Sequence, residues 1–336
     1  MTKKIIVRAD GGFNEGLGHI TRCIYFIKNF NSSFDVIFCI KQNPEVKEFL
    51  TAQYYSVYEI NPNISINEEI DYLVSLSSDL LILDVRNKIN LFFKRCAEKF
   101  NKVLRFDDSD RNISIYSKYY LNYNLYAENI DFDVINKDGK LFLGPKYYIL
   151  NPSFKEYENY ERSFRKRAKN ILITMGGSDP KNLTTKIVKS IIKLKDIHLN
   201  VVLGKLYEYY GEIESLKNNF KDKISIYKNI DNMPEMMAKN EIIIGTGGNT
   251  SFEAAYMGLP GILINQIDLQ ARNSKNYEEK KIFCDGGLGE AKTEGEILDL
   301  VKKLIDSKEI RMNLSENGKN LVSYQGIKSV IEKFIN

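Results

Sequence analysis

The sequence is poor in the residues that build metal centres. It holds only two histidines, His19 and His198, and four cysteines that lie far apart in the chain. The cysteines lack the short spacing of metal sites, and they are typical of reduced thiols in a cytoplasmic protein. We therefore expect neither a metal nor another cofactor. Because histidine is so scarce, each of the two is informative.

Long apolar runs and an excess of one charge are also missing. No stretch reaches the roughly 18 apolar residues of a membrane span. Residues 1–9 form a short strand pattern, without the apolar core of a signal peptide. Lysine and arginine number 48 against 44 acidic residues, an excess too small and too scattered for nucleic-acid binding. We expect a cytoplasmic protein without membrane or nucleic-acid partners, and the oligomeric state stays open.

The first half of the chain alternates short apolar segments with helical patterns. Strands are predicted at residues 4–8, 35–40, 80–83 and 103–106, and helices at 19–30, 45–52, 67–77 and 90–100. Strands alternating with helices of this length indicate a parallel sheet covered by helices on both faces.

The polar stretch 151–169 interrupts this alternation, which then starts again. Strands are predicted at 171–174, 199–203, 224–227, 241–244 and 261–264, and helices at 182–194, 207–220, 233–239, 251–256, 270–280 and from 293 onward. The chain length suits two domains. We predict an α/β fold with two Rossmann-like domains facing a cleft: residues 1–150, a linker over 151–169, and residues 170–336.

Three glycine-rich clusters follow predicted strands, where open parallel sheets bind ligands. The first covers residues 8–19 and continues to Arg22, with Gly16 and Gly18 before a helix that begins near His19. Glycines let the backbone approach a ligand, and the helix N-terminus supplies amide donors and positive potential. The cluster has neither the lysine of a Walker loop nor the spacing of the dinucleotide fingerprint.

His19 falls in the first turn of that helix. The helix dipole disfavours the imidazolium there, so the neutral ring suits a general base. The alternative is a capping or packing histidine.

The second cluster, Gly176, Gly177 and Ser178 followed by Asp179, comes directly after a strand. It predicts a ligand-binding loop, or else a tight strand-to-helix turn capped by Ser178 or Asp179.

The third cluster predicts a diphosphate site that opens a helix. Its backbone amides and small hydroxyls come from Gly247, Gly248, Asn249, Thr250 and Ser251. Glu253 follows within about a turn and could accept hydrogen bonds from two ribose hydroxyls, or else it only favours the helix N-terminus. Gln270 and Asn273 follow the next strand and could reach sugar hydroxyls.

The run from Arg8 to Arg22 resembles the N-terminal motif of the UDP-sugar hydrolases of pseudaminic acid biosynthesis and the related spore-coat polysaccharide family. Residues 175–179 and 247–273 are similar to the same family, and the latter stretch is shared with other GT-B glycosyltransferases. The resemblance spans roughly residues 3–280. It implies a GT-B fold, removal of UDP from a 2,4-diacetamido-2,4,6-trideoxy hexose, and His19 as the group that activates water.

One position departs from that resemblance. The hydrolases carry Asp-His-Tyr where this chain has Asp84, Val85 and Arg86. Arg86 either faces the sugar, where its donors would favour an acidic or acyl oxygen, or turns away and pairs with Asp84 or Asp107.

Two other functions remain open. A GT-B glycosyltransferase would use His19 as base for an acceptor hydroxyl in place of water. A non-catalytic nucleotide-sugar-binding partner protein would need the third cluster, but it would not need a histidine at a helix terminus.

Overall fold

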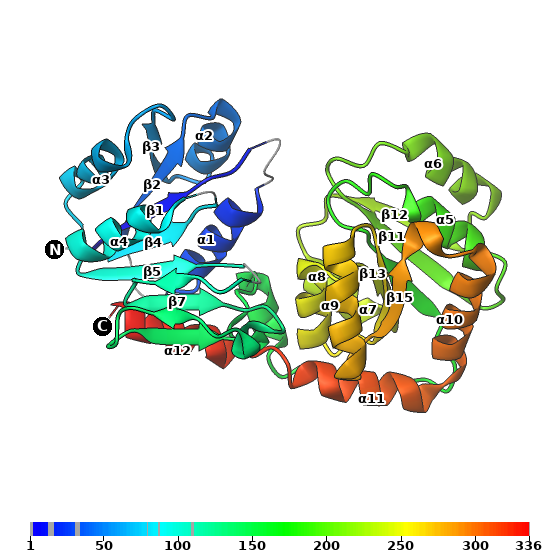
Figure 1. The fold of residues 1–336 in the computed structure, drawn as a ribbon. Helices are drawn as coiled ribbons and strands as arrows, with labels where there is room; N and C mark the ends of the chain where they lie inside the picture. The colour runs from blue at the N-terminus through cyan, green and yellow to red at the C-terminus, as the bar shows by residue number, and fades with distance from the viewer. Residues whose placement is uncertain are drawn as a thin grey trace. The chain divides into compact units, whose positions relative to one another are not determined.

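The computed structural model describes residues 3–12, 17–30, 34–78, 80–86, 88–108 and 111–335. The chain divides into two compact units, Met1–Pro152 with Tyr324–Asn336, and Ser153–Ser323 (Figure 1). Both are α/β units built around a parallel sheet. The sheets confirm the two Rossmann-like domains that the sequence predicts.

In the first unit, seven of the described strands pair in the order β3-β2-β1-β4-β5-β7-β9, and every pairing is parallel. The strands are β1 (Lys4–Ala9), β2 (Asp35–Lys41), β3 (Ser56–Ile60), β4 (Leu80–Asp84), β5 (Lys102–Phe106), β7 (Tyr119–Asn122) and β9 (Lys140–Leu143). The short strands β6 (Ser114–Ile115) and β8 (Asp133–Val134) pair separately. The helices are α1 (Gly18–Lys28), α2 (Pro44–Thr51), α3 (Ile66–Ser75), α4 (Asn90–Lys99) and α12 (Tyr324–Ile335).

In the second unit, the described strands pair in parallel in the order β12-β11-β10-β13-β14-β15. They are β10 (Asn170–Ile173), β11 (His198–Leu203), β12 (Ile224–Lys228), β13 (Ile242–Gly245), β14 (Gly261–Asn265) and β15 (Cys284–Leu288). The helices are α5 (Leu183–Ile191), α6 (Tyr210–Asn219), α7 (Met233–Lys239), α8 (Asn249–Tyr256), α9 (Asp268–Glu279), α10 (Glu294–Asp306) and α11 (Lys308–Lys319).

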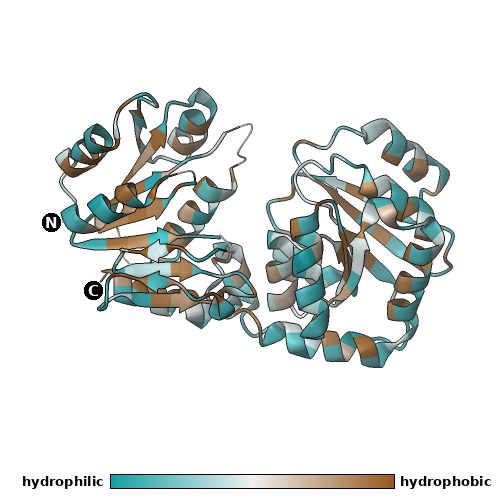
Figure 2. Cartoon of the chain, viewed as in Figure 1, coloured by the Kyte–Doolittle hydropathy of each residue, from teal (hydrophilic) through white to brown (hydrophobic). Residues whose placement is uncertain are grey.

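Continuous apolar runs produce the central strands. Every residue of β4 is buried, and β13 and β14 are likewise buried throughout. Strands covered by helices on both faces need such runs, because both sets of side chains leave water. The strands at the centre of each unit are accordingly mostly hydrophobic, whereas the helices carry polar residues outward (Figure 2).

The strand order reverses once in each sheet. The reversal lies between β1 and β4 in the first unit and between β10 and β13 in the second. Loops after adjacent strands diverge at such a point and leave room for a ligand at the carboxyl edge. The first glycine cluster follows β1, the second follows β10, and the third follows β13.

The end of the chain differs from the predicted domain division. The sequence places all of 170–336 in the second domain, but α12 belongs to the first unit. Its apolar face supplies the reason: Phe334 is fully buried and meets the rings of Phe26 and Tyr119. Figure 1 shows this red helix against the strands of the first unit.

The predicted linker also packs more closely than expected. Residues from Ser153 onward belong to the second unit. Arg311, on α11, is buried and donates to the carbonyl of Arg165 at 2.6 Å, and Arg162 donates to the carbonyl of Met237 at 3.0 Å. These bonds fix the segment 162–165 to the second unit.

Candidate functional site

His19 lies at the strand-order reversal of the first sheet. It occupies the first turn of α1, and Asp84 ends the neighbouring β4. The Nδ1 atom of His19 lies 2.7 Å from Oδ1 of Asp84, and only 8% of the His19 residue is exposed. A carboxylate only accepts hydrogen bonds, so Nδ1 is assigned the hydrogen and Nε2 keeps its lone pair. Among the described residues Nε2 has no hydrogen-bond partner, and this leaves it able to take a proton.

Arg22 holds the other side of the Asp84 carboxylate. Its Nε atom donates to Oδ2 at 2.5 Å and its NH2 group to Oδ1 at 2.5 Å, while NH1 donates to the Tyr123 hydroxyl at 2.9 Å. Burial alone would raise the pKa of Asp84, but the Arg22 guanidinium keeps that pKa below its ordinary value. The sequence predicts that Arg22 contacts the substrate, whereas the structure buries it against protein groups.

Arg86 is the most exposed arginine of this cluster, with 60% of its side chain in solvent. Its NH2 group donates to Oδ2 of Asp108 at 2.9 Å. Asp84 is occupied by Arg22, and Asp107 pairs with Arg105 at 2.6 Å. The ion pair that the sequence offers as one alternative therefore forms, but with Asp108. Within the described ranges, the other donors of this exposed guanidinium form no hydrogen bond.

The first glycine cluster is described only in part. Gly16 lies outside the described residues. Gly18 begins α1 and is exposed, and an added Cβ there would meet no atom within 4 Å. On the strand side, the fully buried Arg8 holds Asp10 through a contact of 2.5 Å. This contact holds Asp10 at the carboxyl end of β1.

The second and third clusters follow the neighbouring strands β10 and β13 at the carboxyl edge of the second sheet. Gly176, Gly177 and Ser178 are exposed after β10, and Gln266 donates to the carbonyl of Met175 at 3.1 Å. Asp179 accepts hydrogen bonds from the backbone amides of Leu183 and Thr184 at 2.9 and 2.8 Å. The capping alternative therefore holds for Asp179. The exposed glycines leave open backbone beside it.

The third cluster forms the turn into α8. Gly248 is the N-cap residue, Asn249 is exposed and Thr250 is half-buried. Ser251 is buried, and its hydroxyl donates to the carbonyl of Gly248 at 2.6 Å and lies 2.8 Å from the Tyr277 hydroxyl. These bonds place the Ser251 hydroxyl within the helix turn, and its contact with a phosphate stays a prediction.

Gln270 and Asn273 hold this loop from α9. The side-chain oxygen of Gln270 accepts from the backbone amide of Gln266 at 3.0 Å, and Asn273 donates to the carbonyl of Gly247 at 3.0 Å. From β14, Asn265 accepts from the Gly247 amide at 2.8 Å. These bonds shape the loop, and the sugar contacts that the sequence predicts for Gln270 and Asn273 stay predictions.

Glu253 is half-buried on the same helix, one turn after the loop. Burial raises its pKa to about 7. No described side chain or backbone group forms a hydrogen bond or ion pair with its carboxyl group. A half-buried carboxyl without a partner is costly in a folded protein, and a ligand with hydroxyl groups would satisfy it.

Sequence reasoning missed three residues of the His19 cluster: Asp84 as its partner, and Tyr123 and Asp108 beyond Arg22. Asp84 had a usable signal, because an aspartate that ends a buried strand faces the ligand edge of the sheet. Only the strand order, however, shows that β4 lies beside β1.

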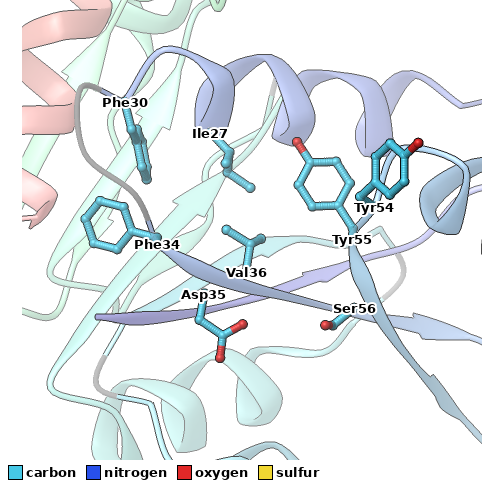
Figure 3. A pocket seen from close by; sticks show the side chains of 8 residues that line it. All are labelled: Ile27, Phe30, Phe34, Asp35, Val36, Tyr54, Tyr55 and Ser56. Atoms are coloured by element: carbon cyan, nitrogen blue, oxygen red, sulfur yellow. The ribbon is translucent and has the colours of Figure 1, made fainter. Parts of the chain in front are cut away.

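A pocket of about 270 Å³ lies elsewhere in the first unit. Asp35 and Ser56, the first residues of β2 and β3, line it together with aromatic side chains such as Phe34 and Tyr55 (Figure 3). It opens at the amino ends of the strands and is therefore distinct from the carboxyl-edge cluster around His19.

Across the described ranges, no group of three or more histidine, cysteine or acidic side chains could hold a metal ion. Within the same ranges, none of the helices combines the length and the apolar character that a bilayer span requires.

Comparisons with known proteins agree with this architecture. The glycosyltransferase family 28 C-terminal domain matches residues 170–332. The crystal structure of MurG from Acinetobacter baumannii superimposes with a TM-score of 0.71, covering 98% of this chain and 99% of that one at 13% identity. That identity supports the fold alone, which is the GT-B fold.

The matches to two relatives span most of the length of those proteins. The spore coat polysaccharide biosynthesis protein of Bacillus subtilis is 25% identical over 95% of this chain and 94% of its own. The UDP-2,4-diacetamido-2,4,6-trideoxy-beta-L-altropyranose hydrolase of Campylobacter jejuni is 28% identical over 76% of this chain and 88% of its own. This chain is thus similar to both proteins over most of its length. The family resemblance predicted from the sequence is confirmed.

A third relative is longer than this chain. An uncharacterized protein of Methanocaldococcus jannaschii is 33% identical over 82% of this chain, and the match spans 58% of the archaeal protein. That archaeal protein therefore has further sequence beside the region shared here.

Proposed function

We propose that the protein hydrolyses a UDP-activated amino sugar to UDP and the free sugar. The observation that carries the proposal is the His19–Asp84 pair, because it fixes the hydrogen on Nδ1 and leaves Nε2 as a base. A protein that only binds nucleotide sugars would not need a histidine held in this way. Two relatives whose names include such a hydrolase support the same reaction.

The proposed reaction requires a base for water and donors for the leaving UDP. His19 Nε2 takes a proton from water, and the water oxygen attacks the anomeric carbon of the sugar. The bond from that carbon to the phosphate oxygen breaks, and its electron pair leaves with UDP. A nucleoside diphosphate needs anion stabilisation more than a strong acid, so amide donors matter at the leaving group.

The second unit supplies the UDP site in this proposal. Backbone amides near Gly248 and the exposed Gly176 and Gly177 would hold the diphosphate, aided by the α8 N-terminus. Glu253, which bonds to no described group, would accept hydrogen bonds from two ribose hydroxyls. Thr250 and Asn249 remain candidate donors because their side chains reach solvent.

The substrate is proposed to be of the UDP-2,4-diacetamido-2,4,6-trideoxy hexose type, used in nonulosonic acid or other surface glycan biosynthesis. The names of the Helicobacter pylori and Campylobacter jejuni relatives support this class. Arg86 is the proposed point of difference, because its exposed donors suit an acyl or acidic oxygen on the sugar.

A glycosyltransferase is the second candidate. The match to glycosyltransferase family 28 and the likeness to MurG favour it. In that case His19 would deprotonate an acceptor hydroxyl in place of water, with the same UDP site.

One experiment separates these functions. The protein is incubated with UDP-, GDP- and CMP-sugars in ¹⁸O-labelled water, with and without acceptors, and nucleotide release is followed. We expect UDP release without acceptor and ¹⁸O in the sugar. The His19→Asn variant should lose about 10²–10⁴-fold in turnover while still binding UDP. Release that depends on an acceptor, or full turnover in His19→Asn, would contradict hydrolysis by this mechanism.

A further inference from the structure

Arg22 and His19 share one carboxylate. They lie three residues apart on α1 and therefore on the same helix face. Arg22 donates one hydrogen bond to each carboxylate oxygen of Asp84. His19 Nδ1 bonds to Oδ1, one of the same two oxygens. Arg22 is 8% exposed and Asp84 is 1% exposed, so water screens these contacts weakly.

The charges around the His19 ring oppose each other. Asp84, 2.7 Å from Nδ1, favours the protonated ring, whereas the NH2 group of Arg22, 3.0 Å from the same atom, disfavours it. Neither the guanidinium nor a protonated Nδ1 can accept a hydrogen bond, so the 3.0 Å approach is a contact between donors. Asp84 alone would attract a second proton to the ring, and Arg22 offsets that attraction.

Other ionisable groups face the pair from the elements packed around it. They are Asp108 after β5, Tyr123 after β7, Cys23 on α1 and, through Asp108, Arg86 after β4. Burial raises the pKa of both the Tyr123 hydroxyl and the Cys23 thiol, so both stay neutral near pH 7. Asp108 lies 3.6 Å from Arg22 and is also held by Arg86. Arg22 is therefore the cation nearest to the ring in the described structure.

We propose that Arg22 is a positioning residue that sets the protonation state of His19. It keeps Asp84 ionised and its carboxylate oriented, so that His19 holds its hydrogen on Nδ1. As the opposing cation it also keeps the ring neutral, so that Nε2 is free to accept the proton of water. The catalytic use of this state rests on the proposed function. The state itself does not, because it exists without substrate.

Because the chain has only two histidines, their signals can be told apart in a spectrum of the whole protein. ¹⁵N-histidine spectra of the full chain should show His19 with its hydrogen on Nδ1. His198, on β11 and bonded to Ser225, provides an internal reference. In Arg22→Gln the titration midpoint of His19 should move to higher pH, because the opposing cation is lost, and in Asp84→Asn it should move to lower pH. Arg22→Lys keeps the positive charge, so its His19 midpoint should lie close to that of the parent protein.

Kinetics give the second readout. The acidic limb of the kcat/KM profile should move with the His19 midpoint, in opposite directions for Arg22→Gln and Asp84→Asn, and kcat should fall more than KM rises. His19 with its hydrogen on Nε2, or a midpoint unmoved in folded Arg22→Gln and Arg22→Lys, would overturn the proposal. A raised KM with unchanged kcat would instead make Arg22 a substrate ligand. Correct spectral shifts in a protein that hydrolyses no UDP-sugar would refute only the proposed function.

Discussion

Glu253, which we propose binds the ligand, destabilises the folded protein when its carboxyl group is charged. Its carboxyl group is half-buried on α8, and burial raises its pKa to about 7. Between the ordinary glutamate pKa near 4.3 and that value, the folded protein binds a proton that the unfolded chain does not. The stability contributed by the protonated form is therefore present at low pH and lost as pH rises through about 7.

The variant Glu253→Gln removes this titration. Relative to the parent protein, its free energy of unfolding should increase from pH 5 to pH 8, because only the parent must bury a charge at the higher pH. At pH 8 it should bind UDP about ten- to a hundred-fold more weakly, since it loses a charged acceptor. Denaturant unfolding at both pH values and calorimetry with UDP measure this. Glu214→Gln, at an exposed glutamate of α6, is the control. A pH-independent difference would mean that Glu253 is solvated as an ordinary carboxylate.

The residue types of the site were predictable, but the direction of several side chains was not. His19 could be found because histidine is scarce and this one begins a helix after a glycine loop. Arg22 and Ser251 have the donors of ligand-binding residues, yet both are buried and bonded within their units. Sequence shows which donors exist. Whether a donor meets a ligand or a neighbouring carboxylate depends on tertiary packing.

At the scale of elements, strands with unbroken apolar runs were predictable and irregular ones were not. β4 and β13 agree with the predicted segments because their burial demands such runs. By contrast, β3 alternates partly exposed residues, and β15 contains the glycines of Cys-Asp-Gly-Gly-Leu. β9 is a four-residue strand at the sheet edge. Such strands form because a neighbouring strand offers hydrogen bonds, which local sequence does not show.

The turn from β13 to α8 depends on a close approach between elements. A Cβ on Gly247 would lie 2.3 Å from the carbonyl oxygen of Gln270, a distance that atoms cannot adopt. Gly247→Ala must therefore push the loop away from α9, and such overpacking typically costs about 1–3 kcal/mol. We expect UDP affinity to fall about ten-fold or more, measured by calorimetry, because the loop amides lose their alignment.

The control is Gly211→Ala in α6, where an added Cβ meets no atom within 4 Å. It should leave UDP affinity unchanged and raise the free energy of unfolding by about 0.5–1 kcal/mol. Unchanged UDP affinity in a folded Gly247→Ala protein would remove this loop from the proposed nucleotide site.

For the whole molecule, the distribution of the chain between two cores is what the sequence did not reveal. Amphipathic patterns occur in all three of the last helices, α10, α11 and α12. Such a pattern predicts that one face is buried, but it does not predict which of the two units the helix packs against. The division at residue 150 was close to the observed Pro152, because the polar segment that follows interrupts the apolar alternation. The last helix packs against the first unit through contacts with residues far away in the sequence, which local patterns do not show.

That packing choice leads to a prediction about how the two units unfold. Phe334 is fully buried in α12 against Phe26 and Tyr119, so Phe334→Ala should destabilise the first unit by about 3–5 kcal/mol. UDP, which we propose binds the second unit, should still raise the melting temperature of that unit, because ligand binding stabilises only the folded state that binds it. Scanning calorimetry with and without UDP measures both transitions.

The neighbouring Lys333→Ala, on the exposed face of α12, controls for changes in the helix itself and should leave both transitions near their parent values. In Phe334→Ala we expect the UDP-insensitive transition to move down alone. If the UDP-sensitive transition moves down with it, the two units unfold together, and α12 stabilises the molecule as a whole. If UDP raises the transition that Phe334→Ala lowers and leaves the other in place, the nucleotide binds the first unit, and the proposed division of labour between Glu253 and His19 is wrong.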